Sequence, residues 1–282
     1  MSLLDKQMRV DLQERLNGQE ISAALYISKA IKEGVSTKGL PSYFFGERNA
    51  KTVVVNLNPG EAAGICDDSW CERTAHFGAS IDDFIANYNQ RQQTYGKKYG
   101  ITPKGKADSF DVKQAAFLTP WEDSGIGLSS YPDWNSEEYR MKAKTKVICN
   151  KLQLELVPYA SAKFDINKNE IARFRPFVDM LLDEIFSIER TYIIFQSAKF
   201  EAIFKDYNKV HRDTFEFLAL EETERPLKED GKLGGKCMVL RINYKGKSCK
   251  ALIAHTFPNQ GLSKAYALMQ KYGKFCFQNF KI

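Results

Sequence analysis

The sequence lacks the long apolar runs that mark membrane and secreted proteins. No stretch approaches the roughly 18 consecutive apolar residues of a membrane helix. The opening stretch MSLLDKQMRVDLQERL is too charged for a signal peptide. We therefore expect a cytoplasmic protein with no membrane partner.

Histidine and paired cysteines are also scarce. The chain has 3 histidines, which lie far apart, and 6 cysteines, none of which form a C-x-x-C pair. Zinc ribbons and iron–sulfur clusters need such spacings, so neither is expected, and no metal or other cofactor is predicted. In a cytosolic protein these cysteines are expected to be reduced, structural thiols.

The remaining composition is that of an ordinary globular protein. The 282 residues are 43% hydrophobic and 27% charged, enough to bury a substantial core. Basic residues exceed acidic ones by 41 − 35 = 6. This excess is compatible with a polyanionic partner but does not demonstrate one.

Alternating strand and helix patterns favour an α/β fold. Residues 3–33 predict two helices, because apolar residues recur there at helical spacing. Strand patterns at 52–57, 151–161, 191–196 and 250–257 are separated by helical patterns, which favours a sheet with a parallel core. We predict a single domain over 1–282, with helices in 1–40 and an inserted β-hairpin in 206–247.

Three of the predicted strands end in polar, turn-rich stretches: NLNPGEAAG, VPYAS and HTFPNQGLS. Ligands of α/β sheets bind outside the carboxyl ends of the parallel strands. The candidate residues brought to one crevice by this rule are Asn58, Glu155, Tyr159, His255, Asn259 and Ser263.

Taken in this order, the segments resemble the uracil-DNA glycosylase superfamily. NLNPG resembles the first motif, in the G-I-N-P-G form of the mismatch-specific uracil/thymine branch, and HTFPNQGLS resembles the second motif. LQLELVPY occupies the position of the uracil-reading strand, and TYIIFQSAKFEAIF that of a strand–helix unit. The resemblance covers about 40–205 and 248–280. It implies a three-layer sandwich around a four-stranded, mostly parallel sheet.

The resemblance also implies roles for individual residues. Asn58 would hold the attacking water, and His255 would stabilise the departing base. Leu262 would fill the stack that a flipped nucleotide vacates, and Ser263 would cap a helix whose amino end could hold a phosphate. The remaining positions are Phe77, Glu155 and Tyr159 for the base, and Pro59, Gly60 and Asn259 for DNA.

Three features depart from the family pattern. Most branches read uracil with an asparagine where this chain has Glu155, and a carboxylate donates a hydrogen bond only when protonated. Asn56 stands where many members have glycine, and the second motif begins His-Thr-Phe-Pro rather than His-Pro-Ser-Pro. A base with two donors would therefore suit the site better than uracil; alternatively, the alignment is shifted by one residue or Glu155 points to solvent.

Three functions therefore stay open on the sequence. The first is a monomeric, monofunctional glycosylase that removes uracil or a related base from single- or double-stranded DNA. The second is a catalytically silent nucleic-acid-binding relative, and the third is an unrelated α/β enzyme acting on a small nucleotide or sugar. Basic residues that either contact DNA or belong to a solvated loop are Arg91, Lys97, Lys98, Lys104 and Lys106.

Overall fold

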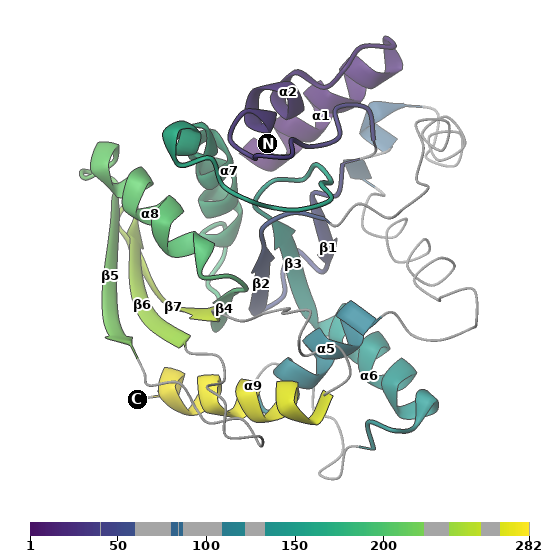
Figure 1. Cartoon of the computed structure of the whole chain (residues 1–282), viewed down its shortest axis with the longest axis vertical. Helices are drawn as coiled ribbons and strands as arrows, with labels where there is room; N and C mark the ends of the chain where they lie inside the picture. Colours follow the sequence, from purple (N-terminus) through teal and green to yellow (C-terminus); the bar gives the residue numbers. More distant parts are fainter. Residues whose placement is uncertain are drawn as a thin grey trace.

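The chain folds around one mixed β-sheet. The computed structural model describes residues 1–39, 41–59, 80–83, 85–86, 109–121, 133–222, 237–254 and 266–281. Within these ranges, seven strands form the sheet, and helices cover both of its faces (Figure 1). The α/β class expected from the sequence is confirmed, although the sheet has seven strands rather than four.

The centre of the sheet is parallel. β2 (Thr52–Asn56) lies between β3 (Lys151–Glu155) and β4 (Tyr192–Phe195) and runs parallel to both. β4 is also parallel to β7 (Lys247–Ala254). The carboxyl ends of these strands therefore lie at one edge of the sheet, which we call the carboxyl edge.

Antiparallel strands extend the sheet on both sides, in the overall order β1-β3-β2-β4-β7-β6-β5. β1 (Phe44–Gly46) pairs with β3, and β6 (Cys237–Tyr244) pairs with both β5 (Phe215–Glu222) and β7. The antiparallel strands expected within 206–247 are thus present. Lys245 and Gly246 connect β6 to β7 with φ of 49° and 77°, a left-handed conformation that suits tight hairpin turns.

One face of the sheet is covered by the N-terminal helices and by α7 and α8 (Figure 1). The helices are α1 (Leu3–Leu16), α2 (Ser22–Ser28), the 3-10 helix η2 (Lys168–Phe174), α7 (Arg175–Ile185) and α8 (Lys199–Val210). The two N-terminal helices were expected. Pro176 lies in the first turn of α7, where a missing N–H is harmless. Val53 and Val55 of β2 pack into this layer.

The opposite face is covered by α5 (Ser109–Leu118), α6 (Glu137–Asn150) and α9 (Tyr266–Lys281). Val54 and Ile194 pack into this layer, which also holds the buried ring of Trp121. A Cβ atom on Gly273 of α9 would lie 1.9 Å from the carbonyl oxygen of Phe117, so α9 and α5 are in backbone contact there. None of the described helices is long and apolar enough to cross a membrane.

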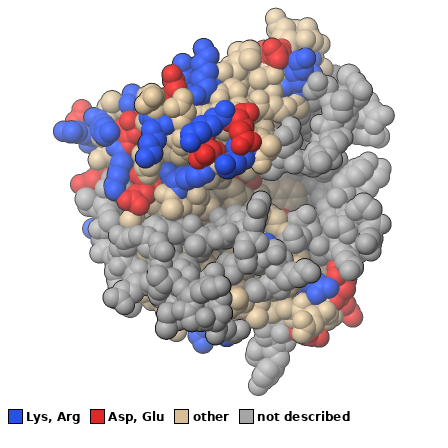
Figure 2. Space-filling model, viewed as in Figure 1, with Lys and Arg blue, Asp and Glu red and all other residues tan. Residues whose placement is uncertain are grey.

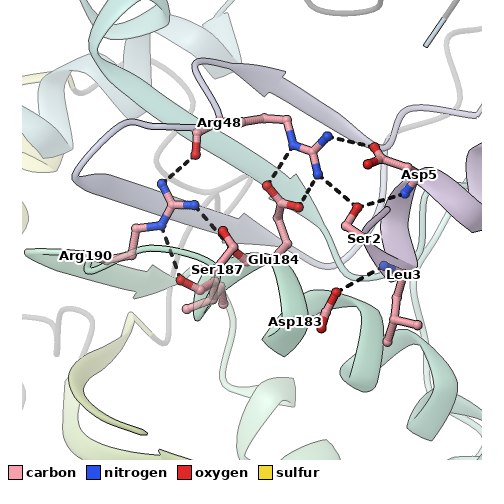
Figure 3. Close-up of polar contacts among 9 residues, drawn as sticks. Ser2, Leu3, Asp5, Arg48, Asp183, Glu184, Ser187 and Arg190 are labelled. Atoms are coloured by element: carbon pink, nitrogen blue, oxygen red, sulfur yellow. Dashed lines mark hydrogen bonds and ion pairs between the residues drawn. The ribbon is translucent and has the colours of Figure 1, made fainter. Parts of the chain in front are cut away.

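An ionic network ties the N-terminal helix to the amino ends of the central strands (Figure 3). Arg48 precedes β2, and its guanidinium donates to Glu184 of α7 (Nε to Oε1, 2.8 Å) and to Asp5 of α1 (Nη1 to Oδ1, 2.7 Å). Arg190 precedes β4 and donates to the carbonyl oxygens of Arg48 (2.8 Å) and Ala50 (2.5 Å). These contacts fix the end of the sheet that lies opposite the carboxyl edge.

Candidate functional site

Four of the site residues predicted from the sequence can be placed: Asn58, Pro59, Glu155 and Tyr159. The other predicted site residues lie outside the described residues: Gly60, Phe77, His255, Asn259, Leu262 and Ser263. So do the basic residues Arg91, Lys97, Lys98, Lys104 and Lys106.

Asn58 lies just beyond β2, at the carboxyl edge. Its Nδ2 donates to the hydroxyl of Ser161 (2.8 Å) and to the carbonyl oxygens of Pro59 (2.9 Å) and Tyr159 (3.3 Å). Carbonyl oxygens only accept, so the amide nitrogen must face this side. The side chain therefore joins the exit of β2 to the segment after β3, and its Oδ1, which accepts no hydrogen bond from the described residues, can accept one from another group.

Glu155 ends β3 directly opposite Asn56, the last residue of β2. Its Oε1 accepts from Nδ2 of Asn56 (3.0 Å) and from Nε2 of Gln153 (2.8 Å). Glu155 is 6% exposed and Asn56 is 7% exposed. The alternative in which Glu155 points to solvent is therefore wrong. Asn56, which the sequence marked only as a departure from the family pattern, is its hydrogen-bond partner.

A buried lysine extends this polar row along β3. Nζ of Lys151 donates to Oε1 of Gln153 (2.8 Å), so Gln153 bridges the ammonium group and the Glu155 carboxyl. Burial raises the pKa of Glu155 to about 7, although hydrogen bonds from Asn56 and Gln153 and the charge of Lys151 oppose the rise. Burial also lowers the pKa of Lys151 to about 8. A substantial fraction of Glu155 is therefore protonated near neutral pH.

Two glutamines meet between α5 and the same face of the sheet, and Gln114 belongs to α5 itself. Gln196 directly follows β4, and its Oε1 accepts from Nε2 of Gln114 (3.0 Å); both side chains are buried. Four buried side chains on this face each have one buried atom with no hydrogen-bond partner within the described parts of the chain. These atoms are Oδ1 of Asn56, Oε2 of Glu155, Oε1 of Gln114 and Nε2 of Gln196. Buried polar atoms are rarely left unpaired, so we expect a ligand or ordered water to complete these bonds.

Tyr159 lies toward the other face of the sheet. Its hydroxyl donates to Oδ2 of Asp11 in α1 (2.8 Å), and the hydroxyl of Tyr43 donates to the same oxygen (2.6 Å). Nε2 of Gln7 donates to the second oxygen (2.6 Å), yet burial raises the pKa of Asp11 to about 6. The structure therefore joins the Tyr159 hydroxyl to α1 and does not bring it to the Glu155 carboxyl.

Sequence patterns did not identify the buried polar partners of Glu155. Lys151, Gln153 and Glu155 alternate with apolar residues, a pattern that usually indicates a strand with one solvated face. β3 instead lies between β1 and β2 and is covered on both faces. These buried partners could have been predicted from one signal, which is the presence of polar residues at alternate positions of a strand in a parallel core. No group of three or more metal-ligating side chains is present within the described ranges.

Comparisons of the chain with protein-family models, curated proteins and solved structures found no match. The resemblance to the uracil-DNA glycosylase superfamily therefore rests on the sequence motifs quoted above. The juxtaposition of Asn56, Asn58 and Glu155 at the carboxyl edge is independent of that resemblance.

Proposed function

We propose that this protein is a DNA-base glycosylase-like hydrolase that binds a nucleobase at the carboxyl edge and cleaves its N-glycosidic bond. The observation that carries the proposal is the position of Asn58 next to the buried Asn56–Glu155 pair, at the ends of two adjacent parallel strands. This is the edge at which α/β sheets bind their ligands.

The Asn56–Glu155 pair can read the hydrogen-bonding edge of a base. Uracil presents an N3–H donor beside the O4 acceptor. Oδ1 of Asn56 would accept from N3–H, and protonated Glu155 would donate from Oε2 to O4. A pKa of about 7 makes the protonated form of Glu155 available near neutrality. Ionised Glu155 would present two acceptors instead, which suits a base edge with two donors.

Asn58 would position the nucleophile. Cleavage of an N-glycosidic bond passes through an oxocarbenium-like sugar and an anionic base, so orienting the water and stabilising the leaving base both lower the barrier. Because Nδ2 is held by three acceptors, Oδ1 of Asn58 is oriented and can accept from a water molecule. A neutral amide orients this water but is not a strong base. The role of His255 beside the leaving base rests on the family resemblance.

Base release from a labelled oligonucleotide tests this function. The substrate carries one uracil, either single-stranded or opposite guanine, and alkali cleaves the chain wherever a base is lost. We expect release by the wild type, a loss of about 100-fold or more in Asn58→Ala, and wild-type release in the exposed control Asn169→Ala. Equal release by Asn58→Ala and the wild type would refute the assignment of Asn58.

The second candidate function is a catalytically silent nucleic-acid-binding protein, because the hydrogen bonds of Asn58 also fit a purely structural role of this residue. In that case Asn58 only joins the exit of β2 to the segment after β3. Oligonucleotide binding without base release, together with a lower melting temperature of Asn58→Ala, is the result that this candidate predicts.

A further inference from the structure

Three lysines from separate parts of the chain converge on one carboxylate. Nζ of Lys32 lies 3.3 Å from Oδ2 of Asp165, Nζ of Lys163 lies 3.9 Å from the same oxygen, and Nζ of Lys199 lies 3.9 Å from Oδ1. We call these four residues the Asp165 cluster. The backbone N–H of Lys32 also donates to the carbonyl oxygen of Asp165 (2.8 Å), so the fold itself brings the two segments together.

The Asp165 cluster holds more positive charge than its carboxylate can neutralise. Three ammonium groups and one carboxylate leave a formal charge of 3 − 1 = +2. The side chains of Lys32 and Lys163 are 62% and 66% exposed, so this charge faces solvent. Burial and then the charges of Lys163 and Lys32 lower the pKa of Lys199, against the opposing effect of Asp165. An anion bound among the lysines would relieve their mutual repulsion.

Two acidic residues of the adjoining helices η2 and α8 already have cationic partners of their own. Glu170 forms an ion pair with Arg173, and Glu201 forms one with Lys205. Figure 2 shows basic side chains gathered, with acidic ones between them, over the part of this face that includes α8.

The Asp165 cluster lies on the same edge of the sheet as the candidate site. Lys163 is two residues beyond Ser161, whose hydroxyl accepts from Asn58. Lys199 begins α8, which follows the carboxyl end of β4. A strand whose base enters the site would therefore pass close to these lysines.

We infer that the Asp165 cluster binds the phosphate backbone of a nucleic-acid strand and positions it for the candidate site. This inference rests on the proposed function. Lysine acts on phosphate as a flexible point charge, and phosphate contacts fix the position of a strand without reading its sequence. A surface of three lysines therefore suits the positioning of a phosphate backbone better than it suits the selection of one ligand of fixed geometry.

The salt dependence of binding tests the inference. A fluorescent single-stranded oligonucleotide without a lesion is titrated with the full chain at several salt concentrations. If both lysines contact phosphates, the double variant Lys32→Gln/Lys163→Gln reduces the slope of log K against log [salt] by about 1.4, or about 0.7 for each contact. The control Lys142→Gln/Lys274→Gln removes two exposed charges from α6 and α9 and should keep the wild-type slope.

A second variant separates binding from structural support. Asp165→Asn removes the neutralising charge and keeps the backbone carbonyl that accepts from Lys32. We expect tighter binding and a steeper salt dependence than in the wild type, whereas a merely structural Asp165 would give unchanged or weaker binding. The latter result would overturn the inference.

The outcomes also separate this inference from the proposed chemistry. A reduced slope in Lys32→Gln/Lys163→Gln supports the inference even if no base is released. An equal slope in this variant and the wild type overturns it even if base is released. Binding of a nucleoside monophosphate but not of the oligonucleotide overturns it as well.

Discussion

Asn56 and Glu155 end neighbouring parallel strands in register, and Nδ2 of Asn56 donates to Oε1 of Glu155 across 3.0 Å. Each residue keeps one buried oxygen without a partner in the described part of the chain. Oδ1 of Asn56 always accepts, whereas Oε2 of Glu155 donates when the carboxyl group is protonated and accepts when it is ionised. The chemical character of the site therefore changes with pH.

The variant Glu155→Gln tests this pH dependence. If protonated Glu155 reads uracil, base release by the wild type should fall about tenfold from pH 6 to pH 8, as the group with a pKa of about 7 loses its proton. Glutamine donates at every pH, so release by Glu155→Gln should be flat over this range. Single-turnover rates at pH 6, 7 and 8 measure both profiles. A variant that shows the same fall as the wild type would assign the proton to another group.

Replacement of Lys151 should shift the pH profile of base release. The positive charge of Lys151 lowers the pKa of Glu155, and Gln153 links the two groups. In Lys151→Met the pKa of Glu155 should rise, so uracil release should persist to higher pH than in the wild type. The exposed control Lys142→Met should leave the pH midpoint of uracil release unchanged. An unchanged midpoint in Lys151→Met would mean that the two groups are not coupled.

Asp11 should make the protein more stable in mild acid. Its pKa rises from 3.8 to about 6 on folding, so its contribution to stability is complete below pH 3.8 and is lost as pH rises through about 6. The free energy of unfolding of the wild type relative to Asp11→Asn should fall by about 3 kcal/mol between pH 3.5 and pH 8. Urea unfolding at several pH values measures this difference. The free energy of unfolding of the exposed control Asp213→Asn should instead have the same pH dependence as that of the wild type.

Tyr159→Phe separates a structural tyrosine from one that binds the base. The hydroxyl of Tyr159 is buried against Asp11, and its removal should lower the free energy of unfolding by about 1–2 kcal/mol. Base release should be unchanged at a temperature where the variant is folded. A loss of release without a loss of stability would restore the base-binding role that the family resemblance implies.

The sequence predicted the elements whose side-chain patterns are regular. The N-terminal helices and the central strands were expected because their apolar residues follow helical or strand spacing. α5 and α6 were not expected, since Gln114 and Lys144 are polar side chains that point inward and break the pattern. The number of strands was underestimated because the edge strands add to the sheet by antiparallel pairing.

The candidate site was predictable only in part, for a related reason. The ends of strands can be read from the sequence, and this reading brought Asn58 and Glu155 to the carboxyl edge. Their partners depend on which strands lie side by side. Asn56 and Glu155 are 99 residues apart, and Gln114 and Gln196 are 82 residues apart. No local pattern specifies such pairs.

The ionic network at the amino ends of β2 and β4 has a consequence for strand register. A slip of one residue between β2 and β3 would turn Asn56 to the opposite face of the sheet and remove it from Glu155. Arg48 and Arg190 oppose any movement of β2 along its axis, because they tie the start of β2 to Glu184 of α7 and to the start of β4. The hydrogen bond between Asn56 and Glu155 at the carboxyl edge therefore depends on contacts at the other end of β2.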